Sequence, residues 1–243
     1  MEHIYGRHSV LSVLENSDRQ VKLITIQQDL PNNKILDIIV QLAKSKGIEV
    51  EFVSLPKLER KYSMGKRRHQ GVIAVTSDLA TFTLKQLLEH LSENPLLAIL
   101  DHVNDPQNLG AIVRSAELAG FDAVIMPERR NAPLTNTVVK TSAGATEKIP
   151  IVIVGNVNET IRVLKKHNIW VYGIETGGEN IYSTDFAAPT ALVFGAEGDG
   201  LSTLTASLCD KILTIPMYGK TESLNVSVAA GIAMFTVARF RHQ

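Results

Sequence analysis

Short apolar runs alternate with helix-period segments along the chain from residue 95 onward. The apolar runs predict strands over 96–100, 123–126, 149–154, 169–174, 191–194 and 211–215. The segments between them repeat their apolar residues every three or four positions and predict helices over 106–119, 134–143, 157–167, 203–208 and 224–240. Because the runs are apolar on both faces and separated by helices, they indicate a parallel sheet covered on both sides.

The first 76 residues carry a smaller version of the same alternation. Here the pattern predicts strands over 23–26, 49–53 and 71–75, and helices near 9–15 and 34–46. Residues 77–94 hold one short helical stretch, 84–91, and end at Asn94 before Pro95, a pair typical of a boundary. We therefore predict a small α/β domain over 1–76, a linker over 77–94 and a parallel-sheet α/β domain over 95–243.

Composition narrows the class of protein. The chain has 243 residues, of which 44% are hydrophobic, so it can bury a sizeable core. A single cysteine, Cys209, excludes an intramolecular disulfide framework and a cysteine-based metal site, which fits a reducing cytoplasm, and we expect no bound metal. The N-terminus has no secretory-signal pattern, and no uncharged apolar stretch reaches the roughly 18 residues that span a bilayer, so we expect no membrane partner.

Charge is balanced over the chain but not along it. The 25 Lys and Arg equal the 25 Asp and Glu, which by itself argues against a nucleic-acid partner held by bulk charge. Residues 1–76, however, hold 12 basic residues against 8 acidic ones, whereas residues 77–243 hold 13 against 17. Any contact with RNA should therefore depend on a local basic patch and on shape.

One basic cluster in the first segment is a candidate for phosphate contact. It surrounds Tyr62 and Gly65, faces a single acid, Glu59, and consists of Lys57, Arg60, Lys61, Lys66, Arg67 and Arg68. Two interpretations stay open: an RNA-contacting loop, or an ordinary solvated basic loop, because short basic clusters are common.

Three strand ends of the larger domain carry polar or glycine-rich residues, where ligands of parallel sheets bind. At the first, Asp105 and Pro106 predict a helix start that places Asn108 in the first turn. The apolar residues that follow should form a buried stripe along this helix, and Arg114 lies outside that stripe. Arg114 is free either to reach a ligand or to pair with Glu117 on the helix surface.

The second strand end is the glycine-rich segment from Gly195 to Gly200. Its spacing is neither that of a dinucleotide-binding fingerprint nor that of a Walker loop, which argues against a dehydrogenase. Glu197 and Asp199 would also repel a pyrophosphate. The segment suits a nucleoside-bearing ligand without phosphates, with a plain turn as the alternative.

The third strand end leads from Ile215, Pro216 and Met217 into the last helix. Ser223 is a candidate N-cap for a helix that begins at Leu224 and is apolar nearly all round, so we expect it to be buried. Asn225 and Ser227 are polar positions at its start. They either satisfy loop backbone or face a ligand.

These three stretches together resemble the motifs of the SpoU, or TrmH-like, branch of the SPOUT RNA methyltransferases. The order and spacing match over roughly 95–240: Asp105-Pro-x-Asn108-x-Gly110-x-x-x-Arg114, Gly195-x-Glu197-x-x-Gly200, Ile215-Pro216-Met217 and Ser223-Leu224-Asn225-Val226-Ser227. The 1–76 segment is similar to the substrate-binding domain fused to many members. The resemblance implies a SPOUT domain with a deep C-terminal trefoil knot and a homodimer with each site completed across the interface.

The resemblance also implies a reaction and its residues. S-adenosylmethionine would bind in the knot against Gly195, Gly200, Ile215, Met217 and Leu224. Its methyl group would pass to a ribose 2′-hydroxyl of RNA, with a guanosine of 23S ribosomal RNA as the expected target. The matching catalytic and RNA-contacting positions are Asn108, Arg114, Glu197 and Asn225.

The role of Arg114 and the identity of the substrate leave alternatives. The family proposal makes this arginine the general base, but a guanidinium is effectively always protonated, so we expect it to clamp the phosphate beside the target hydroxyl. Asn108 and Asn225 would hold the site geometry. Two alternatives stay open: a tRNA ribose 2′-O-methyltransferase, and a catalytically silent RNA-binding relative.

Overall fold

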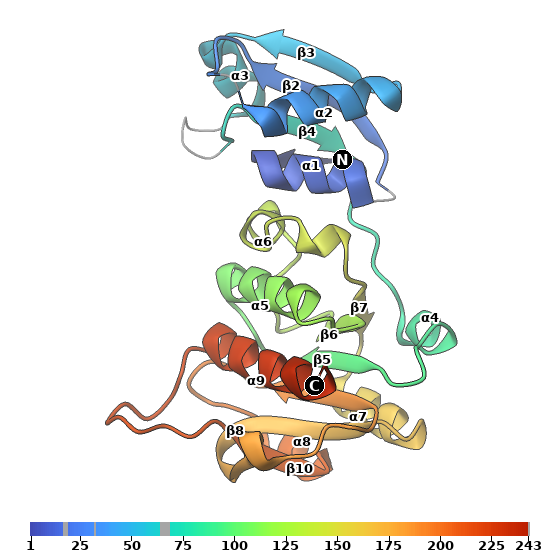
Figure 1. Cartoon of the computed structure of the whole chain (residues 1–243), viewed down its shortest axis with the longest axis vertical. Helices are drawn as coiled ribbons and strands as arrows, with labels where there is room; N and C mark the ends of the chain where they lie inside the picture. The colour runs from blue at the N-terminus through green and yellow to red at the C-terminus, as the bar shows by residue number, and fades with distance from the viewer. Residues whose placement is uncertain (17–18, 32, 64–68, 243) are drawn as a thin grey trace. The chain divides into compact units, whose positions relative to one another are not determined.

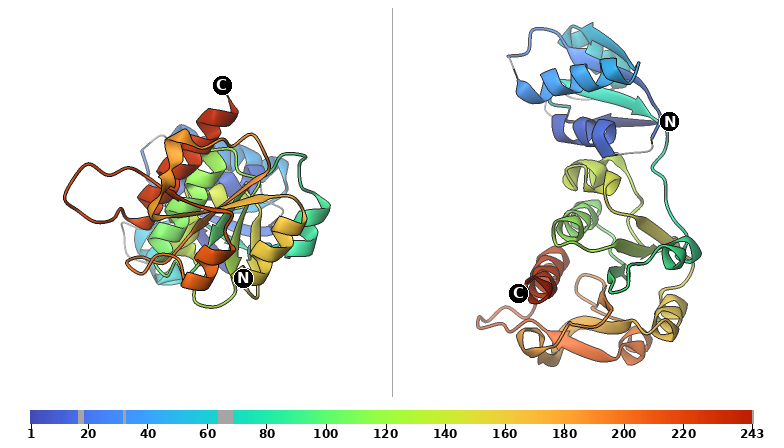
Figure 2. Two further views of the ribbon diagram at one scale, coloured as in Figure 1. Left: turned by 90° about the horizontal axis from the view of Figure 1, so that it is seen from below. Right: turned by 45° about the vertical axis from the view of Figure 1, so that its right-hand side comes forward.

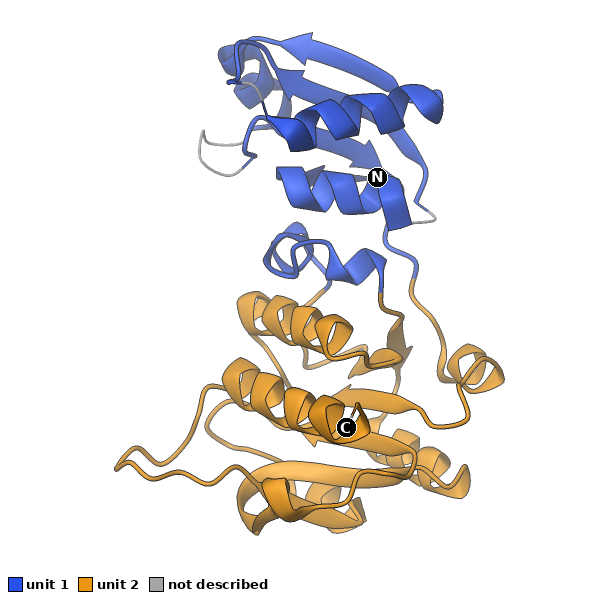
Figure 3. Cartoon of the chain, viewed as in Figure 1, with its two compact units in different colours: residues 1–80, 134–148 blue, residues 81–133, 149–243 orange. Residues whose placement is uncertain are grey.

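The computed structural model describes residues 1–16, 19–31, 33–63 and 69–242. The chain forms two compact units, which we call the first and second unit (Figure 3). The first unit comprises Met1–Ala80 and Leu134–Lys148, and the second comprises Thr81–Pro133 and Ile149–Gln243. The predicted division into 1–76, 77–94 and 95–243 stays a prediction about domains.

The second unit is built on the predicted parallel sheet, which is confirmed. Its described strands are β5 (Leu96–Leu100), β6 (Ala123–Pro127), β7 (Ile151–Val154), β8 (Trp170–Asn180), β9 (Thr190–Phe194) and β10 (Lys211–Thr214). They lie in the order β10-β8-β9-β5-β6-β7, and every neighbouring pair is parallel. Every residue of the central strands β5 and β9 is buried, as expected for a sheet covered on both faces.

Helices cover both faces of this sheet. They are α4 (Leu84–Glu89), α5 (Pro106–Leu118), α7 (Val157–Lys166), α8 (Thr203–Leu208) and α9 (Val226–Arg241), with a 3-10 turn η2 (Ile181–Ser183). Figures 1 and 2 show α5 and α9 side by side on one face, with α7 and α8 on the other. The core on the α7 and α8 face also takes in Leu87 of α4.

The last helix begins later and is less buried than its sequence predicts. It begins at Val226 with Asn225 as its N-cap, so the predicted start at Ser223 and Leu224 is wrong. Its inner face packs on the unit through Ala230, Ala233, Met234 and Val237, but other apolar side chains are exposed: Val228, Phe235 and Phe240. An apolar helix surface that the single chain leaves uncovered is typical of an interface.

The first unit contains a mixed four-stranded sheet in the order β1-β4-β2-β3. Its strands are β1 (Glu2–Tyr5), β2 (Val21–Gln27), β3 (Glu49–Val53) and β4 (Val72–Thr76). β2 pairs with β3 in parallel, while the β1–β4 and β2–β4 pairs are antiparallel. The described helices are α1 (Arg7–Asn16), α2 (Lys34–Ser45), α3 (Leu55–Tyr62), α6 (Asn136–Thr141) and η1 (Ala145–Glu147).

Half of the predicted basic loop is a helix. Lys57, Arg60 and Lys61 lie on α3, which has Pro56 in its first turn, a favourable place for proline. Tyr62 is buried, and its hydroxyl lies 2.7 Å from the hydroxyl of Thr25. This tyrosine therefore serves the core of the first unit rather than an exposed loop.

A segment that follows β6 in the chain packs in the first unit. Val139 of α6 joins the core formed by α1, α2 and the sheet. The Ser12 hydroxyl donates to the Gly144 carbonyl at 2.8 Å, and a side chain on Gly144 would overlap Ser12. The Arg19 guanidinium lies between the carboxylates of Glu2, at 2.5 Å, and Glu147, at 3.0 Å.

Cys209, at the end of α8, is partly buried against the core of the second unit. Its thiol donates to the Thr205 carbonyl at 3.3 Å. Burial raises the pKa of this thiol to about 12, so it stays protonated at neutral pH. The residue acts as a small side chain at the edge of the core.

Candidate active site

The second unit has a pocket beyond the carboxyl ends of three neighbouring strands. Its lining comes from the middle of β8, where the pairing with β9 ends, from the end of β9 and the turn after it, from the residues after β10, and from the first turn of α9. All five residues that the resemblance assigns to the cofactor lie on it: Gly195, Gly200, Ile215, Met217 and Leu224. Glu197 lies on the same pocket, so segments far apart in the chain form one site.

The glycine-rich segment after β9 is a tight turn that also lines the pocket. Ala196 and Gly200 exchange two backbone hydrogen bonds, of 3.0 and 3.1 Å. A side chain on Gly195 would overlap the backbone of Gly200, and one on Gly200 would overlap the Glu175 carboxylate. Gly200 also has a φ of +65°, in the left-handed region that glycine adopts without strain. The segment is therefore a tight turn that could also contact a nucleoside-bearing ligand, so the two interpretations of its sequence are compatible.

Glu175 is a pocket residue that sequence reasoning missed. It lies near the carboxyl end of the region of β8 that pairs with β9, and one of its oxygens accepts from the Leu201 backbone N–H at 2.7 Å. The carboxylate thereby fixes the end of the glycine-rich turn. A signal was available, because the predicted strand 169–174 ends directly before Glu175, and polar residues at strand ends are candidates for ligand contact.

Three of the four predicted catalytic residues meet at one carboxylate oxygen. The Glu197 Oε1 atom accepts from the side-chain amide of Asn108 at 2.5 Å and from that of Asn225 at 2.8 Å. Because β5 and β9 are neighbours in the sheet, the helix that follows β5 brings Asn108 beside the turn that follows β9. Asn108 is buried, whereas Asn225 and the pocket residue Glu197 are exposed.

The local sequence fixes the two asparagines. Asp105 caps α5 through a bond from the Gln107 N–H, with Pro106 at the first helical position, as predicted. Asn225 caps α9, and its Oδ1 atom accepts from the backbone N–H of Ser227 at 2.9 Å. The backbone-capping alternative is confirmed for Asn225, because its oxygen accepts at the helix start. Its amide group donates to Glu197, and a contact with a ligand stays a prediction.

Arg114 lies apart from this network. The predicted stripe on α5 is buried, with Leu109, Ile112, Val113, Ala116 and Ala119 all at most 3% exposed, and Arg114 falls off it with an exposed side chain. It is not among the described residues that line the pocket. Its role at the site, and its possible pairing with Glu117, stay predictions.

The three remaining predicted RNA contacts, Lys66, Arg67 and Arg68, lie outside the described residues. Their neighbour Lys61 on α3 forms an ion pair with Glu51, which raises the pKa of the lysine and lowers that of the glutamate. This part of the predicted basic cluster is thus partly neutralised within the first unit.

The chemistry of the pocket favours a cationic or neutral ligand over a phosphate. Two carboxylates, Glu175 and Glu197, lie on it, and its other lining side chains are apolar or uncharged. Among the described residues, no group of three or more His, Cys, Asp or Glu is placed to hold a metal ion. The described helices include none long and apolar enough to cross a membrane.

Comparisons with known proteins agree with this architecture. The sequence pattern of the SpoU rRNA Methylase family matches residues 95–235, and that of the RNA 2′-O ribose methyltransferase substrate-binding domain matches residues 3–82. The chain is 40% identical to the 23S rRNA (guanosine-2′-O-)-methyltransferase RlmB of Xylella fastidiosa, over 98% of this chain and 96% of that protein.

Solved structures share the fold. The SpoU methyltransferase AviRb from Streptomyces viridochromogenes, solved with AdoMet, superposes with a TM-score of 0.82 at 23% identity, over 99% of this chain and 90% of that one. A TrmH/SpoU tRNA-modifying enzyme of A. aeolicus superposes with a TM-score of 0.56 at 30% identity, over 65% of this chain and 82% of that one. From its pocket, its motifs and its relatives together, this chain belongs to the SpoU rRNA methylase family.

Proposed function

We propose that this protein transfers a methyl group from S-adenosylmethionine to the ribose 2′-hydroxyl of a guanosine in 23S ribosomal RNA. One observation carries the choice of reaction and substrate. The identity of 40% to a 23S rRNA (guanosine-2′-O-)-methyltransferase extends over nearly the whole of both chains, substrate-binding region included. The Asn108–Glu197–Asn225 network beside the pocket supplies the corresponding site.

The pocket residues fit the cofactor. Gly195 and Gly200 line the pocket without side chains, so a flat nucleoside can approach the backbone there closely. Met217 and Leu224 add apolar surface, and the nearby carboxylates suit a positively charged sulfonium. When bound, S-adenosylmethionine supplies an electrophilic methyl group.

The chain's own residues then have to position a hydroxyl and accept its proton. Glu197 holds the two asparagine amides in one arrangement, so that Asn108 and Asn225 fix the shape of the site beside the pocket. Arg114, exposed on α5, clamps the phosphate next to the target ribose and so orients the 2′-hydroxyl. A permanently protonated guanidinium is suited to that clamp, whereas it is a poor proton acceptor.

The finer architecture is part of the same proposal. The segment from β10 to α9 forms a deep trefoil knot. The chain divides into a substrate-binding domain (1–76), a linker (77–94) and a methyltransferase domain (95–243). The protein works in the cytoplasm. Lys66, Arg67 and Arg68 contact the RNA backbone.

The protein also acts as a homodimer in this proposal. The exposed apolar side chains Val228, Phe235 and Phe240 support it, because they give α9 a surface that a second copy would cover. The dimer would complete each site across its interface.

A tRNA ribose is the second candidate substrate. It is favoured by the 30% identity to the A. aeolicus tRNA-modifying enzyme, but that match covers only 65% of this chain. The region matched as a substrate-binding domain in this chain favours the ribosomal alternative.

The test supplies purified protein with methyl-labelled S-adenosylmethionine and either unmodified 23S rRNA or total tRNA. We expect label in 23S rRNA, at a position whose phosphodiester bond resists alkaline cleavage because its 2′-hydroxyl is blocked. Label only in tRNA would select the second candidate. If neither RNA is labelled, the protein would be an RNA-binding relative without this activity. That conclusion would hold whether or not calorimetry shows cofactor binding.

A further inference from the structure

The loop between β10 and α9 has an exposed tip beside the pocket. Figures 1 and 2 show it projecting away from the sheet of the second unit. Both ends of the loop line the pocket, through Met217 on one side and Ser223 and Leu224 on the other. The tip between them carries Tyr218 and Lys220.

Tyr218 is held close to the pocket by its chain neighbour. Consecutive Cα atoms are about 3.8 Å apart, so the Cα of Tyr218 lies that far from the Cα of the pocket residue Met217. The tyrosine side chain is nevertheless 95% exposed. Within the described chain it makes no hydrogen bond and no ring contact, so neither packing nor a polar partner in its own unit accounts for it.

The tip combines an aromatic ring with a cation. Lys220 is exposed two residues after Tyr218. A substrate that brings a flat base and a phosphate together would use both side chains of the tip. Nucleic acid has this chemistry, and aromatic side chains stack on unpaired bases of RNA.

We propose that Tyr218 stacks on a base of the RNA substrate next to the methylated ribose, with Lys220 on an adjacent phosphate. This inference rests on the proposed function and extends it, because it makes the loop that lines the cofactor pocket a substrate-binding element as well. Tyr218 is then a positioning residue, which sets how the target nucleotide enters the site.

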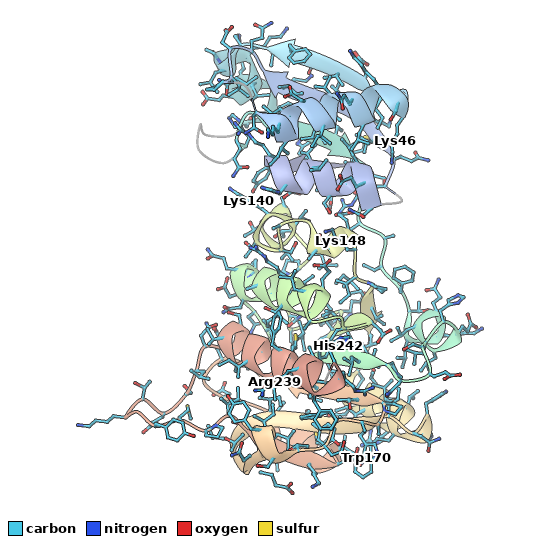
Figure 4. The ribbon with its side chains drawn as sticks, in the orientation of Figure 1. Lys46, Lys140, Lys148, Trp170, Arg239 and His242 are labelled. Atoms are coloured by element: carbon cyan, nitrogen blue, oxygen red, sulfur yellow. The ribbon has the colours of Figure 1, made fainter. Side chains whose placement is uncertain are left out.

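Three variants test the tyrosine: Tyr218→Ala, Tyr218→Phe and, as a matched control, Trp170→Ala. Trp170 is an exposed aromatic residue of the same unit at the start of β8, the end of the strand away from the pocket (Figure 4). For Tyr218→Ala we expect binding of a 23S rRNA transcript to weaken about 5- to 140-fold, as for the loss of one stacked base. Tyr218→Phe and Trp170→Ala should bind RNA like the wild type, and all three should bind S-adenosylmethionine normally.

A fourth variant, Lys220→Gln, should lower the slope of log affinity against log salt by about one, because one phosphate contact is lost. Unchanged RNA affinity of Tyr218→Ala would overturn the inference. So would a fall in affinity that accompanies dissociation of the protein in sedimentation velocity, since the ring would then contact a second copy of the chain. RNA affinity decides this question even if the wild type methylates nothing, an outcome that would refute only the proposed function.

Discussion

At the scale of single residues, the polar side chains beside the pocket meet at one carboxylate. Glu197 is exposed, yet its Oε1 atom is the acceptor for a buried asparagine and for the N-cap of the last helix. Two amide donors on one oxygen leave little freedom for any of the three side chains. The carboxylate thus connects the helix after β5 with the helix after β10 through short polar contacts.

Replacing Glu197 by alanine should lower both stability and methyl transfer. The buried amide of Asn108 would lose its acceptor, which costs about 1–3 kcal/mol of unfolding free energy. Asp199→Ala is the matched control, since Asp199 is an exposed carboxylate of the same turn with no hydrogen bond among the described residues, and it should change stability by less than about 0.5 kcal/mol. Equal urea midpoints for the two variants would contradict this role of Glu197.

Arg114 can be assigned as a clamp or as a base by one substitution. Arg114→Lys keeps a positive charge but loses the planar, two-pronged geometry that grips a phosphate. We expect methyl transfer to fall about tenfold or more with the shape of the pH profile unchanged, the size of one lost charge-assisted contact. Near-wild-type turnover with a pH profile displaced toward the lysine pKa would instead support the base.

The motifs locate the site residues, but not all of their surroundings. Asn108, Glu197 and Asn225 are recognisable because each lies in a spaced motif at a strand end. Glu175 follows a predicted strand but lies in no such motif, and its bond to the backbone of Leu201 forms only in the folded chain. Sequence spacing also cannot reveal that one oxygen serves both asparagines.

At the scale of elements, the start of the last helix is the critical point. Asn225 uses its oxygen to cap α9 and its amide to contact Glu197, so a single side chain orients the helix and the site. The sequence suggested Ser223 as the cap, since both residues are good N-caps and apolar periodicity does not distinguish starts two residues apart. Tertiary contact with Glu197 decides between them.

Two variants separate the functions of Asn225. Asn225→Asp keeps an oxygen for the cap but loses the amide donor, whereas Asn225→Ala loses both. We expect Asn225→Ala to lower the unfolding free energy by about 1 kcal/mol more than Asn225→Asp does, and both to lose most methyl transfer. Full activity of Asn225→Asp would show that the bond to Glu197 is dispensable, because that variant cannot make it.

Sequence reasoning missed β1 and α3, each for a different reason. β1 is only four residues long and is stabilised as an edge strand by pairing with β4, 70 residues away in the chain. α3 is rich in lysine and arginine, so its charges concealed a helix whose buried side is formed by Leu58 and Tyr62. The long buried strands and amphipathic helices of the second unit were predicted because their periodicity is strong.

At the scale of the whole molecule, the chain leaves the second unit once and returns. Residues 134–148 follow β6 and precede β7, but they belong to the first unit, where Val139 of α6 joins the core. Periodicity predicted a helix in this segment without showing which core its apolar face joins. The buried pair between Arg19 and Glu147 fixes the segment there, with side chains 1% and 0% exposed.

Arg19→Met should destabilise the first unit. The substitution leaves the Glu147 carboxylate buried without its partner, and breaking a buried ion pair in this way costs about 3–5 kcal/mol. The control is Arg162→Met, which breaks the exposed pair with Glu159 and should cost at most about 1 kcal/mol. Urea unfolding followed by circular dichroism compares them, and similar losses in the two variants would refute a structural role for the buried pair.

The proposed product of this protein is a ribose-methylated guanosine in 23S rRNA. The most direct measurement digests 23S rRNA, labelled by the purified protein, to nucleosides and identifies the methylated one by mass spectrometry. We expect 2′-O-methylguanosine, with the added mass on the ribose fragment, and its loss when Asn225 is replaced by alanine. Label on a base, or no label in 23S rRNA, would contradict it.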